Sequence, residues 1–191
     1  MRAIPLRRYL LFVAIVLLGT VADLTTKSWI FARLWQRPEV LEIVPGFVEL
    51  EVSLNQGALF GIGQGMTRLF AALSILALLG VAYWLFWLGE IRKLWLCVAL
   101  AAVTAGILGN LYDRLALHGM VWPPNYELAG EPIHAVRDWI LLRYGDYRWP
   151  NFNIADSLLV CGAIMIGIEG LREQRRAASA GTDEGAPSND D

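Results

Sequence analysis

Long uncharged stretches alternate with polar segments along this chain, and four of the stretches approach the length of a membrane span. They run over residues 9–22, 69–88, 94–112 and 152–171. A transmembrane helix needs about 20 apolar residues. The second and third stretches reach that length unaided, whereas the first does so only by including Asp23 and Lys27. The fourth has to include Asp156, because its uncharged core from Leu158 to Ile168 is too short to cross a bilayer.

Composition supports this interpretation. Of the 191 residues, 56% are hydrophobic and only 18% are charged, and the mean hydropathy is +0.46, which is far from that of a soluble domain. The expected fold is an all-α membrane protein with a small extracytoplasmic β-element and surface loops. One domain is expected over residues 1–176, with spans at about 9–31, 67–88, 94–112 and 152–171. The Gly-, Ser- and Asp-rich segment 177–191 has no apolar period and is predicted to be a disordered tail.

The amino terminus is open to two interpretations. Three arginines precede the first apolar stretch, and Thr20-Val21-Ala22 resembles a signal-peptidase cleavage site. A cleaved signal peptide is one interpretation and a retained membrane helix is the other. Apolar residues continue through Trp29, Ile30 and Phe31, which favours the retained helix.

Basic residues predict the orientation, because short cytoplasmic segments of membrane proteins are rich in Lys and Arg. Of the 16 basic residues, half fall in three short segments: before the first span, between the second and third, and after the fourth. We therefore expect both termini and the tail in the cytoplasm. The two long segments, roughly residues 23–68 and 113–150, would then face outward and bring three acid-bearing motifs to the outer face.

One strand is predicted in the first outer segment. From Val48 to Leu54 apolar residues alternate with polar ones, a period of two that is typical of an amphipathic strand, and Asn55-Gln56-Gly57 follows as a turn. A small sheet at the membrane surface would either bind an extended peptide through its main chain or simply cover the helices. Periodicity does not separate these alternatives.

Each polar cluster also has a purely structural interpretation. Asp23 and Lys27 are one helical turn apart and are placed to pair with each other. Asp113 is placed to pair with its neighbour Arg114. Asn153, three residues before Asp156, fits a helix cap. Cys97 and Cys161 are predicted to be small core hydrophobes, and the spacing of His118 and His134 is not that of a metal site.

The gathering of acids at one membrane face favours chemistry over structure. A charged side chain within a span costs several kcal/mol unless it is paired, and such residues usually mark functional sites. Hydrolysis of a peptide by carboxylates needs two that share a proton, one acting as general base and the other as general acid. A proton-coupled transporter is the alternative from another class, but internal repeats and acids at the midplane are missing. An envelope scaffold would leave the acids unexplained. The chain has neither a Gly-rich phosphate loop nor a nucleic-acid-binding patch.

Five short motifs follow one another along the chain: Asp23-x-x-x-Lys27, Asn55-x-Gly57, Gly109-Asn110-x-x-Asp113-Arg114, Val136-x-Asp138-x-Ile140 and Phe152-Asn153-x-Ala155-Asp156-Ser157. In this order they resemble the motifs of the bacterial lipoprotein signal peptidases, the type II prolipoprotein signal peptidases. The resemblance implies a four-helix aspartyl endopeptidase of the bacterial inner membrane that removes signal peptides from prolipoproteins, just before a diacylglyceryl-modified cysteine. It implies that Asp138 and Asp156 are catalytic. The residues implied to shape the site and hold the substrate are Asp23, Lys27, Asn55, Gly57, Asn110, Arg114, Asn153 and Ala155.

The resemblance also implies which partners to expect. Diacylglyceryl prolipoproteins would be the substrates and membrane lipid the surroundings, with no metal, no organic cofactor and no nucleic acid, and the protein is expected to be a monomer. The chain departs from the family in one place. Twenty-three residues separate Arg114 from Asp138, more than is typical, and they are predicted to form an inserted surface loop.

The insertion leaves two candidates for the first catalytic acid, Asp113 and Asp138. An ion pair with Arg114 would hold Asp113 ionised, which makes it a poor proton donor. Asp138 opens the apolar run that begins at Trp139, and a poorly hydrated setting raises the pKa of a carboxyl group. Arg137 opposes that shift, but adjacent residues on an extended segment point in opposite directions. The sequence therefore favours Asp138.

Overall fold

Four long helices and a small antiparallel sheet make up the part of the chain that the computed structural model describes, residues 5–37, 39–57 and 62–183. Each of the four helices is long and apolar enough to cross a membrane. They are α1 (Leu6–Leu34), α2 (Thr67–Ala82, continued by the π-helical turn η2, Tyr83–Trp87), α3 (Leu94–Arg114) and α4 (Ile154–Asp183). The predicted fold class is confirmed, and α1 continues unbroken through Asp23 and Lys27, as the retained-helix interpretation requires.

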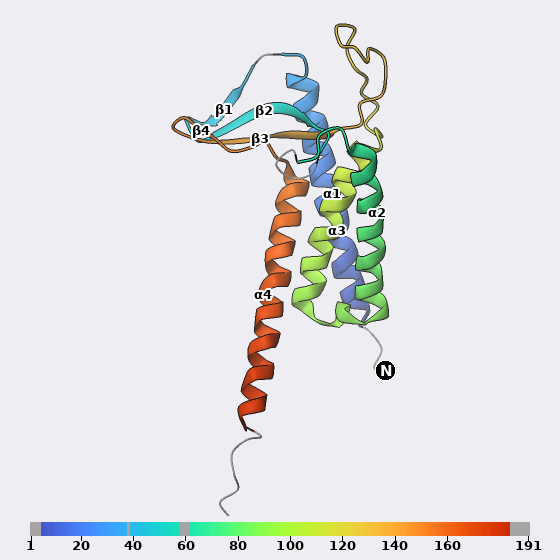
Figure 1. Cartoon of the computed structure of the whole chain (residues 1–191), viewed down its shortest axis with the longest axis vertical. Helices are drawn as coiled ribbons and strands as arrows, with labels where there is room; N and C mark the ends of the chain where they lie inside the picture. Colours follow the sequence, from blue (N-terminus) through green and yellow to red (C-terminus); the bar gives the residue numbers. More distant parts are fainter. Residues whose placement is uncertain (1–4, 38, 58–61, 184–191) are drawn as a thin grey trace, which may run out of the picture.

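α4 is longer than the sequence analysis expected. The disordered tail was predicted to begin at Ala177, but the helix continues to Asp183 and extends well beyond the other three helices (Figure 1). The residues from 171 to 180 include Ala, Arg, Glu, Gln and Leu, all strong helix formers, so the helix propagates past the apolar stretch. Residues 184–191 lie outside the described part of the chain.

α3 is the central helix and packs against α1, α2 and α4 (Figure 1). Most of its residues are buried, and many of them are Ala or Gly. A Cβ atom placed on Gly106 would lie 2.5 Å from the backbone oxygen of Ala155, and one on Gly162 would lie 2.6 Å from the Cγ2 atom of Val103. Small residues therefore allow the backbones of α3 and α4 to approach closely, as they do between helices in membranes.

The sheet lies across one end of the helices and extends sideways past α4 (Figure 1). Its four antiparallel strands follow the order β1 (Leu41–Val44), β2 (Val48–Asn55), β3 (Val136–Tyr144) and β4 (Tyr147–Arg148). The predicted strand is confirmed as β2. β3, which carries Asp138, pairs with β2 so that Asp138 lies opposite Ser53. Two segments far apart in sequence thus form one surface beside the helix ends.

The inserted segment between Arg114 and Asp138 forms a loop that stands at the sheet end of the bundle (Figure 1). Its two arms meet at a bridge between Val121 and Pro132, and the rings of Trp122 and Tyr126 are 5.1 Å apart. The predicted surface loop is therefore present, and it is closed on itself.

The opposite end of the bundle gathers the basic segments. α1 begins there, α4 ends there, and the short link between α2 and α3 lies there too (Figure 1). Lys93 of that link lies 2.7 Å from Glu173 of α4 and 2.9 Å from Glu90. One end of the molecule therefore carries the Lys- and Arg-rich segments, and the other carries the sheet.

Candidate active site

The segment that leads into α4 is docked on β3. The backbone oxygen of Phe152 accepts hydrogen bonds from the backbone nitrogens of Trp139 (3.0 Å) and Ile140 (2.8 Å), and the Phe152 nitrogen donates to the Ile140 oxygen (3.0 Å). These bonds fix the start of α4 against the strand that carries Asp138. The last two sequence motifs, separated along the chain, are in this way brought side by side.

Asn153 caps α4 and also reaches Asp138. Its Oδ1 atom accepts a hydrogen bond from the Asp156 nitrogen (2.9 Å), and its own nitrogen donates to Asp156 Oδ2 (3.2 Å), which is a reciprocal capping arrangement. Its Nδ2 atom donates to Asp138 Oδ1 at 2.6 Å. The predicted cap is confirmed, and the same fully buried side chain joins the two candidate catalytic acids.

Two further amides hold the pair. Asn110 of α3 donates from Nδ2 to Asp156 Oδ1 at 2.8 Å, while its Oδ1 atom accepts from Asn153 Nδ2 at 3.2 Å. Asn55, at the end of β2, forms a side-chain hydrogen bond with Asp138. Each carboxyl group is therefore held by neutral amide groups from different elements of the fold.

The Asp138 side chain is nearly inaccessible to solvent, with 2% of the residue exposed. Burial, and then the charge of Asp156, raise its pKa from the usual 3.8 to about 8, against the opposing effects of Asn153, Lys27 and Asn55. This rise in the pKa is the one expected from the apolar run that follows Asp138 in the sequence. At neutral pH Asp138 therefore holds a proton that it can donate.

A second group of charged side chains is buried on the other side of Asn110 from Asp138 and Asp156. Lys27 Nζ lies 2.7 Å from Asp23 Oδ2, 3.1 Å from Asp113 Oδ2, and donates to Asn110 Oδ1 at 3.0 Å. Arg137 Nη2 lies 2.8 Å from Asp113 Oδ1. The predicted pair of Asp23 with Lys27 is confirmed. The predicted partner of Asp113 was wrong: its carboxylate binds Lys27 and Arg137, not the adjacent Arg114, because that side chain leaves the helix in another direction.

Arg114 points toward the turn that follows β2. Its Nη2 atom donates to the backbone oxygen of Gly57 at 3.0 Å, and its guanidinium lies 5.7 Å from the centre of the Phe70 ring. Its charge acts on both Asp156 and Asp138. Its buried Nε atom has no hydrogen-bond partner among the residues that the structure describes. Within the described part of the chain, Arg114 therefore has one donor without a partner close to the two acids.

Gly57 and Ala155 are placed by their backbones. The Gly57 nitrogen donates to Asn55 Oδ1 at 2.9 Å, which closes the predicted turn after β2. The nitrogen of the fully buried Ala155 donates to Asp23 Oδ1 at 2.9 Å. A Cβ atom on Gly109 would collide with the Asp23 carboxylate and lie 3.1 Å from the Ala155 Cβ atom. Small residues at 109 and 155 thus let three helices meet at Asp23.

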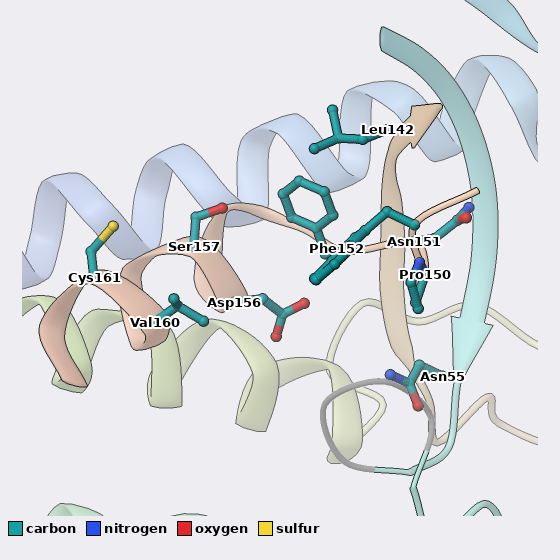
Figure 2. Close-up of a pocket in the computed structure, with 10 residues that line it drawn as sticks. Asn55, Leu142, Pro150, Asn151, Phe152, Asp156, Ser157, Val160 and Cys161 are labelled. Atoms are coloured by element: carbon teal, nitrogen blue, oxygen red, sulfur yellow. The ribbon is translucent and has the colours of Figure 1, made fainter. Parts of the chain in front are cut away.

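A cavity of about 350 Å³ opens beside Asp156. Figure 2 shows the Asp156 carboxyl group pointing away from α4 into this region. Apolar side chains dominate the lining, which comprises Asn55, Leu142, Trp149, Pro150, Asn151, Phe152, Asp156, Ser157, Val160 and Cys161.

Cys97 is buried as predicted, but Cys161 is exposed, so the prediction of a core position was wrong for Cys161.

All ten site residues expected from the sequence fall into one connected region. Arg137 was not among them, although it contacts Asp113 and precedes Asp138. The sequence held one signal for Arg137: adjacent residues of a strand point in opposite directions, so residue 137 faces away from Asp138. Asn151 was also missed; its Nδ2 atom donates to the backbone oxygen of Glu51 at 2.8 Å. In the part of the chain described, no group of three His, Cys, Asp or Glu side chains is arranged around a possible metal ion.

Comparison with known proteins assigns the family. The family model described as signal peptidase (SPase) II matches residues 15–172. This chain belongs to the signal peptidase II family. It is 43% identical over 172 residues to the lipoprotein signal peptidase of Rhodopirellula baltica, covering 87% of this chain and 74% of that one. It is 34% identical to the lipoprotein signal peptidase of Clostridium novyi, covering 84% and 97%.

A solved structure agrees with the fold. A bacterial membrane enzyme superposes with a TM-score of 0.69 at 29% identity, covering 85% of this chain and 88% of that one. The chain is therefore a multi-pass membrane protein and, as a signal peptidase II, an aspartyl protease. The match spans all five motifs from which the resemblance was drawn.

Proposed function

We propose that this chain cleaves prolipoproteins just before a diacylglyceryl-modified cysteine, with Asp138 and Asp156 as the catalytic pair. Membership of the signal peptidase II family supports removal of signal peptides from prolipoproteins. The observation that carries the choice of residues is the shared partner Asn153, which hydrogen-bonds both carboxyl groups beside an apolar cavity.

The chemistry follows from two carboxyl groups in different protonation states. Asp138 holds the proton at neutral pH, which leaves Asp156 as the general base. A water molecule gives a proton to Asp156 as its oxygen attacks the scissile carbonyl carbon, and Asp138 donates its proton to the carbonyl oxygen. When the C–N bond breaks, the proton on Asp156 passes to the leaving amine of the cysteine, and one hydroxyl proton of the tetrahedral intermediate returns to Asp138 as the C=O bond re-forms. The signal peptide then ends in a new carboxylate.

The remaining residues position this pair. Asn110, Asn153 and Asn55 orient the carboxyl groups through neutral hydrogen bonds. Arg114 offers its unpaired Nε donor to a substrate carbonyl or to the developing negative charge. The other four act at a distance from the reacting atoms: Asp23 and Lys27 support Asn110 and Ala155, and Gly57 anchors Arg114.

The cavity supports a substrate that stays partly in the bilayer. It lies between the end of β3 and the first turns of α4, where Val160 and Cys161 are exposed on the outside of a membrane span. A diacylglyceryl-modified peptide would keep its acyl chains in lipid while its peptide bond reaches Asp156. The proposed partners are such prolipoproteins and membrane lipid, without nucleic acid, and the active unit is a monomer.

The proposed location is the bacterial inner membrane, with both termini cytoplasmic and the sheet outside. The basic segments at one end of the bundle support this orientation. Reporter fusions after Arg176 and within residues 88–93 should report a cytoplasmic position, and a fusion near Tyr126 an external one. A cytoplasmic signal at Tyr126 would overturn the orientation.

The direct test is cleavage by the purified full chain. In detergent, the protein should shorten a lipidated prolipoprotein, while the same precursor without the diacylglyceryl group stays uncut. Mass spectrometry should place the new amino terminus at the modified cysteine. Absence of product from a folded sample would refute the function, and cleavage at another bond would refute the proposed position of the cut.

A further inference from the structure

Arg137 precedes Asp138 on β3, yet its side chain enters a different environment. Only 3% of the side chain is exposed. Its Nε and Nη2 atoms lie 2.9 and 2.8 Å from Asp113 Oδ1, and its backbone nitrogen donates to Asp113 Oδ2 at 3.0 Å. Three contacts with one carboxylate therefore join the first residues of β3 to the end of α3.

The same guanidinium reaches α1. Its Nη1 atom donates to Ser28 Oγ at 3.4 Å, and it lies 5.9 Å from the centre of the Phe31 ring. Side chains of neighbouring strand residues leave on opposite faces. Fixing Arg137 against α1 and α3 therefore fixes the direction in which Asp138 leaves the strand, toward Asn153.

The contact between Arg137 and Asp113 also affects the net charge near Asp138. A cation next to a buried carboxyl group stabilises its ionised form. Here the Arg137 charge is matched, because the buried cluster of Asp23, Lys27, Asp113 and Arg137 holds two negative and two positive groups. The other charges that act on Asp138 come from Asp156 of α4, Lys27 of α1 and Arg114 of α3.

We propose that Arg137 is a positioning residue for proteolysis: paired with Asp113, it aims Asp138 at Asn153, and Asp113 cancels its charge at Asp138. The proposal rests on the proposed assignment of Asp138 and Asp156 as the catalytic pair. It gives Asp113 a role that needs no contact with substrate. It also explains why a buried arginine next to the acid does not keep that acid ionised.

The pH dependence of kcat/KM tests this proposal, because its basic limb reports the protonated acid of the free enzyme. In the unaltered protein that limb should have its midpoint near pH 8, where Asp138 loses its proton. Arg137→Met leaves the cluster with one excess negative charge and should move the midpoint upward by about one pH unit. Asp113→Asn leaves one excess positive charge and should move it downward by about as much. The double variant is neutral and should return to the starting value.

Two controls separate this effect from a loss of structure. Arg143→Met removes another β3 arginine, whose Nε lies 2.9 Å from the buried Glu49, and should leave the midpoint unchanged. Arg137→Lys keeps the charge but loses the forked contact, so it should keep the midpoint and lower kcat about tenfold or more with little change in KM. Unshifted midpoints in both single variants, shifts in the same direction, or full activity of Arg137→Lys would overturn the proposal. Failure of the unaltered protein to cleave would instead refute the proposed function.

Discussion

Two groups of carboxyl side chains lie on either side of Asn110, and they differ in what they bind. Asp23 and Asp113 contact the cations Lys27 and Arg137 directly. Asp156 and Asp138 are held by the amides of Asn110, Asn153 and Asn55. Asp23 and Asp113 are fully buried, whereas Asp156 is partly exposed and lines the cavity, so both the partners and the access differ between the two groups.

The difference shows how a membrane protein separates structure from chemistry. An ion pair between buried side chains holds together the elements of the bundle that carry the charges. The amide donors of Asn153 and Asn55 favour the ionised form of Asp138, but burial and the charge of Asp156 outweigh them and raise its pKa to about 8. We therefore propose that the ion-paired cluster supports the fold and that the amide-held pair is the reactive site.

Removing the central cation of the cluster should have the largest effect on the fold. Lys27→Met leaves Asp23 buried without a cation, and we expect a loss of about 3–5 kcal/mol of stability together with loss of cleavage. Thermal unfolding of the purified protein in detergent would measure it. The matched control is Lys93→Met, whose side chain and partner Glu173 are both exposed to solvent, so its loss should change stability far less. Equal stability of the two variants would mean that the buried cluster is not a support.

Arg114→Lys tests whether the Arg114 side chain is needed for cleavage or only for the stability of the fold. Lysine keeps the charge, but its donors lie on a single nitrogen, so it cannot reach Gly57 and also place a donor at the position of the Arg114 Nε atom. We expect about a hundredfold loss of cleavage rate with normal accumulation in the membrane. Arg148→Lys, on the exposed pair with Glu51, is the control and should remain active. Full activity of Arg114→Lys would reduce the residue to a charge at the end of a helix.

A smaller effect is expected at Asn153, where the cap and the contact with Asp138 can be separated. Serine is a good helix cap but has no amide nitrogen to reach Asp138. Asn153→Ser should keep the stability of the protein and lose about tenfold in kcat, whereas Asn153→Ala should lose both activity and about 1 kcal/mol of stability. Steady-state rates and thermal unfolding would give the two readouts. An Asn153→Ser variant with normal kcat would show that the contact with Asp138 does not matter for catalysis.

The sequence predicted the four helices well because their apolar stretches are long and nearly free of charge. It also predicted β2, where apolar and polar residues alternate. β3 was harder, since the run from Trp139 to Leu142 is apolar on both faces and shows no alternation. The partner of Asp113 could not be read from the chain, because Arg114 is adjacent in sequence whereas Arg137 arrives by way of the sheet. Ion pairs between distant segments depend on strand register and helix packing, which local patterns do not encode.

The most direct measurement compares Asp→Asn substitutions in the two groups of carboxylates. Each replacement keeps the shape of the side chain and removes only the ionisable group. Asp138→Asn and Asp156→Asn should each abolish prolipoprotein cleavage while the protein remains folded and inserted. Asp113→Asn should retain partial activity and lose stability. If Asp138→Asn cleaves normally while Asp113→Asn is inactive yet as stable as the unaltered protein, the catalytic pair is Asp113 with Asp156 and the account is wrong.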